Sequence, residues 1–326
     1  EMKPYKFEPY MKSTLWGGER IAAFKGVSST ETNIGESWEL SGVPGHESVT
    51  ADRGIIDDVD LGLTLTQLID KRKELLLGKK VYEKFGNKFP LLIKFIDSHQ
   101  DLSIQVHPND ELAAKRHCCP GKSEMWYIID SDPGAKIYSG LRRQITPDEY
   151  EQMAKAECGE GMDAIMDVIA SHESHMGDLF FLPAGRLHSI GAGNFLVEIQ
   201  QTSDITYRVY DYGRRDADGN LRELHIDQAK DAINYSVDTE YRMSYDSTKP
   251  VSQLIECPYF VTHRVVSPGA RRVDFGVDSF VAVVCLWGEA NINGVDVKKG
   301  DTILVPASEN VLYIFGTATF ITAYMP

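Results

Sequence analysis

Short runs rich in Val, Ile, Phe, Leu and Tyr recur along the chain with Gly, Pro, Asn and Asp between them, as is typical of strands and their turns. The clearest runs cover residues 89–96, 103–107, 124–129, 195–200 and 281–286. Two longer stretches, residues 65–85 and 146–171, have helical spacing instead. In the second stretch, Thr146 suits a helix N-cap and Pro147 the first helical position. The pattern predicts a mainly β protein with helices around the β core.

One segment of the chain is repeated later in the sequence. Residues 177–184 and 300–307 both read Gly-Asp, four strand residues and Pro-Ala. This repeat suggests two copies of one β-barrel unit. Eight residues could also match by chance, because glycine and proline commonly stand at the ends of strands. Five residues beyond the proline, the first copy has His188 and the second has Val311, so only the first copy carries a candidate metal ligand there.

A polar stretch, residues 243–253, separates the two copies and contains Ser-Thr-Lys-Pro. We therefore predict a metal-binding catalytic domain over residues 1–248 and a second, metal-free domain over residues 249–326.

Composition narrows the possible partners and location. The 326 residues are 42% hydrophobic and 25% charged, and no stretch approaches the roughly 20 apolar residues that cross a bilayer. A formal charge of −14 disfavours a nucleic-acid partner, although a few convergent Lys and Arg side chains can still hold a small phosphate. Five cysteines without a C-x-x-C spacing indicate neither a disulfide framework nor a cysteine zinc site. We expect a cytoplasmic protein, since the N-terminal residues also lack the apolar core of a secretion signal.

Candidate metal ligands lie on three predicted strands. Strand alternation places Ser103, Gln105 and His107 on one face, Glu124 begins an apolar run, and His188 follows a Gly-containing turn. Each of these residues alone is compatible with a structural role. Together, two imidazoles, a carboxylate and an amide oxygen form a ligand set that suits Zn²⁺, with manganese, iron or cobalt as substitutes.

Three further charged residues stand in or near apolar strands. Lys94 and Glu198 interrupt otherwise apolar runs, so they should face a cavity or a partner of opposite charge, and a buried Glu198 can have a raised pKa useful for proton transfer. Lys94 could instead be a strand-edge lysine. Arg208 lies among tyrosines, where a surface salt bridge is the alternative role.

The spacing from Gly177 through Pro183-Ala184-Gly185 to His188 resembles the second motif of the cupin superfamily. Residues 103–108, 122–127, 185–191 and 203–211, with 15–18 and 35–39, resemble the short bacterial, metal-dependent mannose-6-phosphate isomerases. The resemblance implies two cupin-type jelly-roll β-barrels with a short helical insertion near residues 146–172. Ser123 departs from it, because many relatives have Pro or Thr there.

By that resemblance the metal ligands are Gln105, His107, Glu124 and His188, with one Zn²⁺ per chain, and the active-site arginine is Arg208. It also assigns catalytic positions to Lys94, Lys122 and Glu198. We expect Ser103, Lys122 and Arg208 to contact the substrate.

The resulting hypothesis is an aldose–ketose isomerase that interconverts mannose 6-phosphate and fructose 6-phosphate through an enediol. Its partner is a phosphorylated hexose, and no obligate protein partner is indicated. The alternatives are a non-catalytic sugar-binding cupin, which should lack some of Lys122, Glu198 and Arg208, and an iron-dependent cupin oxygenase, against which four protein ligands argue.

Overall fold

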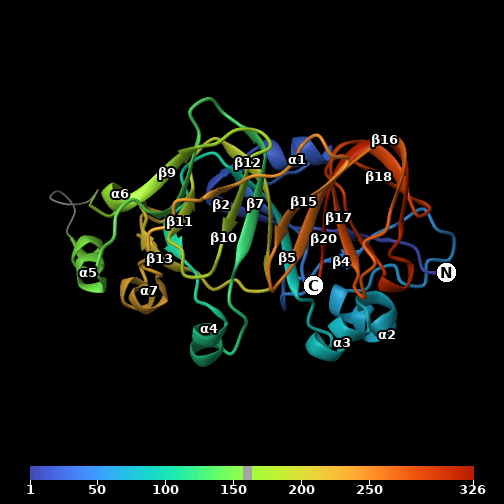
Figure 1. Cartoon of the computed structure of the whole chain (residues 1–326), viewed down its shortest axis with the longest axis horizontal. Coiled ribbons are helices and arrows are strands. Elements are labelled where there is room, and N and C mark those ends of the chain that lie inside the picture. The colour runs from blue at the N-terminus through green and yellow to red at the C-terminus, as the bar shows by residue number, and fades with distance from the viewer. Residues whose placement is uncertain (157–163) are drawn as a thin grey trace.

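Three antiparallel sheets dominate the computed structural model, which describes residues 1–156 and 164–326 (Figure 1). The largest sheet contains most of the C-terminal strands together with two short N-terminal ones. Its path is β15 (Val251–Glu256), β16 (Val261–Val273), β20 (Leu312–Tyr324), β17 (Val281–Ile292), β19 (Thr302–Val305), β1 (Tyr5–Glu8) and β4 (Val49–Thr50), with β18 (Val295–Lys298) paired to β17.

The other two sheets come from residues 10–243. The seven-stranded sheet runs β14 (Arg242–Met243), β10 (Leu179–Leu182), β7 (Glu124–Ser131), β12 (Asn194–Gln201), β5 (Leu91–Ser98), β2 (Tyr10–Gly18) and β3 (Ile34–Leu40). The five-stranded sheet runs β13 (Tyr207–Tyr210), β6 (Ile104–Val106), β11 (His188–Ile190), β8 (Lys136–Leu141) and β9 (Ile169–Glu173). The prediction of a mainly β protein is confirmed.

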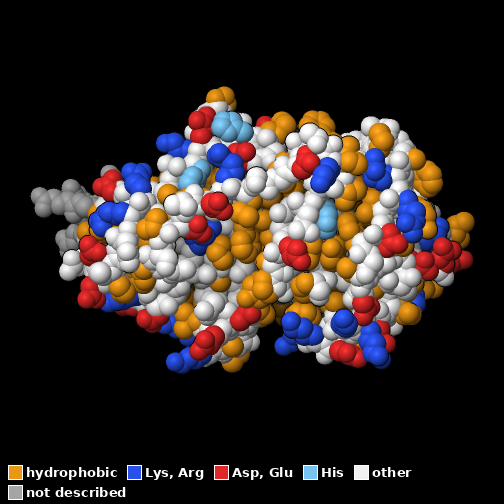
Figure 2. Space-filling model, in the orientation of Figure 1, with side chains coloured by type: hydrophobic (Ala, Val, Ile, Leu, Met, Phe, Trp, Pro, Cys, Tyr) orange, Lys and Arg blue, Asp and Glu red, His pale blue; other side chains and the backbone are white. Residues whose placement is uncertain are grey.

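The helices lie around the sheets (Figure 1). They are α1 (Arg20–Lys25), α2 (Leu65–Leu77), α3 (Lys79–Phe85), α4 (Asp110–His117), α5 (Pro147–Lys155), α6 (Ala164–Val168) and α7 (Ile226–Ala232), with a 3₁₀ turn at Ala307–Glu309. Acidic and basic side chains are interspersed over the face seen in Figure 2. No helix in the described ranges is long and apolar enough to span a membrane.

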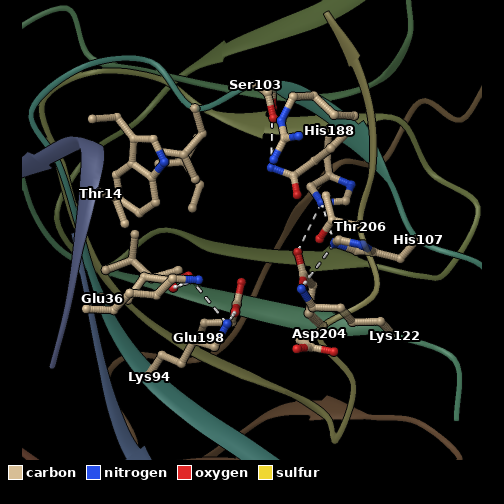
Figure 3. Close-up of a pocket in the computed structure, with 18 of the residues that line it drawn as sticks. Thr14, Glu36, Lys94, Ser103, His107, Lys122, His188, Glu198, Asp204 and Thr206 are labelled. Carbon is tan, nitrogen blue, oxygen red and sulfur yellow. Dashed lines mark hydrogen bonds and ion pairs between the residues drawn. The ribbon is translucent and has the colours of Figure 1, made fainter. Parts of the chain in front are cut away.

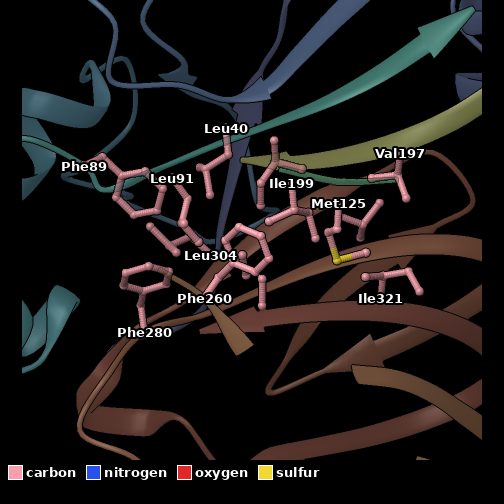
Figure 4. Packing of buried hydrophobic residues seen from close by; sticks show 14 of the residues in the cluster. Leu40, Phe89, Leu91, Met125, Val197, Ile199, Phe260, Phe280, Leu304 and Ile321 are labelled. Carbon is pink, nitrogen blue, oxygen red and sulfur yellow. The ribbon is translucent and has the colours of Figure 1, made fainter. Parts of the chain in front are cut away.

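Strand alternation in the seven-stranded sheet separates a core from a cavity. Val197 and Ile199 on β12 pack into a buried cluster with Leu304 and Ile321 of the eight-stranded sheet (Figure 4). Leu196, which directly precedes Val197, belongs to a different cluster with Trp16, Ile128 and Ile190. Because successive side chains point to opposite faces, Glu198 must lie on the same side as Leu196, away from the eight-stranded sheet.

The two predicted helical stretches are only partly correct. Residues 65–85 form α2 and α3, which meet at Gly78 with a φ of 90°, and Lys73, with a φ of 47°, interrupts α2. In the second stretch Thr146 caps α5 in a reciprocal capping box with Glu149, and Pro147 begins the helix as predicted. The helical insertion nevertheless ends at Val168, because residues 169–173 pair with β8 as a strand. Residues 157–163 of this stretch lie outside the described residues.

The repeated segment has the same local structure in both places. Gly177 and Gly300 adopt left-handed φ angles of 86° and 91°, and each precedes a short strand, β10 or β19. The left-handed turn explains the glycine at both positions. The two strands lie in different sheets, β10 beside β7 and β19 beside β17.

Candidate active site

A cavity of about 470 Å³ lies between the seven-stranded and five-stranded sheets (Figure 3). Every candidate site residue named from the sequence lines it: Lys94, Ser103, Gln105, His107, Lys122, Glu124, His188, Glu198 and Arg208. In Figure 3, Glu36, Lys94 and Glu198 are gathered on one side of the cavity, and Ser103 and His188 on the other.

Three buried side chains converge in this cavity as a possible metal site. Atoms of His107, Glu124 and His188 that could bind a cation all lie within 4.8 Å of one another. The two Nε2 atoms are 3.1 Å apart, Glu124 Oε1 is 3.2 Å from His188 Nε2, and Glu124 Oε2 is 3.6 Å from His107 Nε2. All three residues are buried.

The hydrogen bonds of the two Nδ1 atoms determine whether each Nε2 atom can donate or accept. His107 Nδ1 lies 2.9 Å from the carbonyl oxygen of Ile205, and His188 Nδ1 lies 2.7 Å from that of Arg186. Because a carbonyl only accepts, each Nδ1 must donate, and a neutral ring then has a bare lone pair on Nε2. Two such lone pairs facing one another favour a cation between them, and backbone-anchored Nδ1 atoms are usual for metal-binding histidines.

The electrostatics of the cluster also fit a divalent cation. Burial, together with the nearby Lys122 ammonium, lowers the pKa of His107 to about 3, so the ring is neutral, as a ligand must be. Glu124 is buried beside the two rings, and a divalent cation between these three residues would stabilise the charge of its carboxylate. Glu124 Oε2 has no hydrogen-bond partner in the described part of the chain, although it is buried. Nitrogen ligands about 2.0–2.1 Å from a tetrahedral zinc are about 3.3 Å apart, close to the separation seen here.

Gln105 lies next to this cluster on β6. It pairs with His188 on one side and Arg208 on the other, while Ile104 and Val106 point into a separate apolar cluster. Its Nε2 donates to the Ser103 carbonyl at 3.3 Å, which leaves the amide oxygen available to a cation. The alternation predicted for residues 103–107 is therefore present.

The loop before β11 brings His188 to the cluster. Gly185 donates its N–H to the carbonyl of His107 at 2.9 Å and has a left-handed φ of 91°. A Cβ at this position would lie 3.0 Å from the Ala232 carbonyl oxygen. The Ser123 hydroxyl accepts from the N–H of Ala184 at 3.0 Å, which ties the same loop to the start of β7 and so to Glu124.

The opposite wall of the cavity carries a network of buried charges. Lys94 Nζ lies 3.4 Å from Glu36 Oε1 and 3.7 Å from Glu198 Oε1, and Trp126 Nε1 donates to Glu198 Oε2 at 2.8 Å. Burial and the negative charge of Glu124 raise the pKa of Glu198 to about 7 despite the two lysines. This carboxyl can hold or release a proton near neutral pH.

The two lysines of this wall respond differently to burial. Burial alone would lower the pKa of the Lys94 ammonium. The negative charges of Glu36 and Glu198 have the larger combined effect and raise this pKa. In Lys122, burial and the Lys94 charge together lower the pKa. Of the pair, Lys122 therefore gives up its proton more readily.

Several other cavity residues have no role assigned from the sequence, among them Glu36, Trp38 and Arg222. Glu36 and Trp38 share a face of β3, and the Trp38 ring lies 4.7 Å from Lys94 Nζ. Residues 35–39, Gly-Glu-Ser-Trp-Glu, have no regular alternation of polar and apolar side chains that would have indicated this face. Arg222 comes from a loop without strand or helix periodicity, where the sequence has no signal either.

Comparisons with known proteins identify the family. Residues 5–133 match the family described as phosphomannose isomerase type I, catalytic domain. The chain is 33% identical to mannose-6-phosphate isomerase ManA of Bacillus subtilis (strain 168), over 99% of both chains, and 30% identical to the mannose-6-phosphate isomerase of Streptococcus mutans, over 93% of this chain and 92% of that one. The crystal structure of the mannose 6-phosphate isomerase from Bacillus subtilis superposes with a TM-score of 0.86 at 30% identity, covering 99% of each chain. This chain therefore belongs to the type I phosphomannose isomerase family.

Proposed function

We propose that this protein interconverts mannose 6-phosphate and fructose 6-phosphate, with one Zn²⁺ per chain bound by Gln105, His107, Glu124 and His188. The observation that carries the proposal is the pair of Nε2 atoms 3.1 Å apart beside a buried carboxylate, in the same cavity as Glu198 and Lys94. The Bacillus subtilis relative that matches over 99% of both chains is named mannose-6-phosphate isomerase, which supports the substrate.

The reaction moves two protons and leaves the composition of the sugar unchanged. In the aldose-to-ketose direction, a base removes the C2 proton while O1 takes up a proton, giving an enediol. A proton then returns to C1 and O2 loses one, giving the ketose. A divalent cation at this site would supply Lewis-acid stabilisation of the negative charge that develops on the sugar oxygens.

Glu198 is the carboxylate best suited to carry the proton between C2 and C1. Its pKa of about 7 matches this task, because a base that must both accept and return a proton works best near the operating pH. Trp126 and Lys94 hold its two oxygens in place. Lys122, with its lowered pKa, is suited to exchange a proton with O1 and O2.

Ser103, Lys122 and Arg208 serve as contacts to the substrate in this proposal. Ser103 is buried at the cavity wall just before β6, and Arg208 faces the cavity from β13. Their hydroxyl, ammonium and guanidinium groups are donors, which the hydroxyl and phosphate oxygens of the sugar require.

We also infer a division into two cupin-type jelly-roll units, a metal-binding catalytic unit over residues 1–248 and a metal-free unit over residues 249–326. The repeated Gly-Asp-strand-Pro segment in β10 and β19 supports it. In this division β1 and β4 of the first unit complete the sheet of the second, since β1 pairs with β19.

The test is isomerisation of mannose 6-phosphate by the metal-stripped protein, before and after zinc is added. Restoration of fructose 6-phosphate formation by stoichiometric zinc is the expected result. A zinc-loaded protein that produces no fructose 6-phosphate would overturn the proposed function, and full activity of the stripped protein would overturn the role of the metal.

A further inference from the structure

A second guanidinium accompanies Arg208 at the cavity wall. Arg208 comes from β13 and Arg222 from the loop between β13 and α7, and both line the cavity. The charges that act on Arg208 are chiefly those of Arg222, Asp211, Arg214 and Glu223. These groups form one charged cluster, which we call the arginine cluster.

Asp211 aligns Arg222 through a two-point contact. Arg222 Nε lies 2.8 Å from Asp211 Oδ2, and Nη2 lies 2.7 Å from Oδ1. The third nitrogen, Nη1, has no hydrogen-bond partner in residues 1–156 and 164–326, so this edge of the guanidinium is available to a ligand. Forked contacts of this kind orient a planar guanidinium well.

The positive charge of the arginine cluster is only partly balanced. Asp211 is shared between Arg222 and Arg214, whose Nη2 lies 2.6 Å from Oδ1. Arg208 donates from Nη1 to the neutral carbonyl of Glu223 at 2.9 Å, and its buried Nε has no partner among the described residues. The Glu223 carboxylate is largely exposed and therefore screened by water. Two guanidiniums thus contact one buried carboxylate, and Arg208 has no ion pair with that carboxylate in the described part of the chain.

On the opposite wall of the cavity, which carries Lys94 and Lys122, carboxylates balance the positive charge. Lys94 is accompanied by the carboxylates of Glu36 and Glu198, and Lys122 is acted on by these and Glu124. A phosphate dianion near the lysines would meet these carboxylates, whereas near Arg208 and Arg222 it would meet an excess of positive charge.

We propose that Arg222, aligned by Asp211, binds the phosphate group of the substrate together with Arg208. The phosphate then lies against the five-stranded sheet, and the C1–C2 end of the sugar extends toward Glu198. Arg222 is a determinant of the preference for phosphorylated over unphosphorylated sugars. This inference rests on the proposed function for the identity of the substrate.

The test measures how tightly inorganic phosphate binds to the zinc-loaded protein, by calorimetry and as a competitive inhibitor. Arg222→Ala should weaken phosphate binding roughly 10- to 100-fold, the usual effect of removing a charge-assisted hydrogen-bond donor. The matched control is Arg214→Ala, which removes a guanidinium from the same carboxylate but not from the cavity wall. The KM for mannose 6-phosphate should rise with Arg222→Ala much more than kcat falls, and the ratio of kcat/KM between mannose 6-phosphate and mannose should drop.

Each outcome separates this inference from the proposed function. Unaltered phosphate binding by Arg222→Ala, or equal losses with Arg214→Ala, would overturn the inference even if the enzyme is active. A wild-type protein that binds phosphate through Arg222 but does not isomerise mannose 6-phosphate would overturn the proposed function instead. If Arg222→Ala does not fold, Arg222→Lys takes its place; it keeps the charge but loses the forked contact with Asp211, and phosphate binding should still weaken measurably.

Discussion

His107 and His188 present their Nε2 atoms to each other at 3.1 Å, while each Nδ1 faces a backbone carbonyl oxygen. Neither nitrogen of the facing pair can donate if both rings are neutral, so the two lone pairs repel unless a cation lies between them. The backbone holds both rings in this arrangement, and the pair is therefore preorganised for a metal ion.

Replacement of His188 by Ala should lower zinc affinity by at least roughly 100-fold, because even changes to groups that only orient a ligand cost 10- to 100-fold. Zinc content after dialysis and calorimetric titration measure the effect. His172→Ala is the matched control, since His172 contacts the Ser139 carbonyl and does not line the cavity. Equal zinc affinity in wild type and His188→Ala would refute the metal site.

Removal of zinc should also lower the thermal stability of the protein. A ligand that binds only the native state at about 1,000 times its Kd adds about 4 kcal/mol to the free energy of unfolding. Differential scanning fluorimetry of the stripped and zinc-loaded forms measures the change in Tm. In His188→Ala the increase in Tm on adding zinc should largely disappear. A full increase in that variant would mean that zinc stabilises the protein from another site.

Replacement of Glu198 by Gln should lower kcat about 10²- to 10⁴-fold, the usual contribution of a general base, without removing a metal ligand. Exchange of the C2 proton of mannose 6-phosphate with deuterated water, followed by NMR, measures the same step directly. Asp97→Asn is the control: this buried carboxylate accepts from the Arg20 N–H at 2.8 Å and lies outside the cavity lining. Persistent C2 exchange in Glu198→Gln at the wild-type rate would show that another group is the base.

The site residues within single strands were predictable, because alternation alone places Gln105 and His107 on one face and isolates Glu198 in an apolar strand. The position of Glu36 in the site was not predictable from the sequence. Glu36 lies beside Lys94, 58 residues away in sequence, only because β3 pairs with β5. The strand at residues 169–173 was missed for the same reason: the residues of its partner β8 lie 28 to 37 positions earlier, and this pairing overrides the local helical pattern.

A buried carboxylate outside the active site allows a prediction about acid stability. Asp60 accepts from Tyr5 Oη at 2.7 Å and from Arg72 Nε and Nη2 at 2.9 and 2.7 Å, and Lys71 Nζ lies 2.8 Å away. Although burial opposes ionisation, these donors lower the pKa of Asp60 to about 2 from an ordinary value of 3.8. A carboxyl with a lowered folded-state pKa stabilises the fold above its unfolded-state pKa, and this contribution is lost as the pH falls from about 4 to about 2.

Asp60→Asn should therefore lower the free energy of unfolding by about 2 kcal/mol at pH 7, because Arg72 and Lys71 lose the charged partner that lowers the pKa of this carboxyl, and one pKa unit corresponds to about 1.4 kcal/mol. The difference between wild type and variant should shrink as the pH falls from 4 toward 2, where the wild-type carboxylate also loses its charge. Urea unfolding at pH 7, 4 and 3 measures the two curves. Asp70→Asn, at an exposed position on the same helix as Arg72, should stay close to wild type throughout. A difference for Asp60→Asn that is constant across this range would show that the charge of Asp60 does not stabilise the fold.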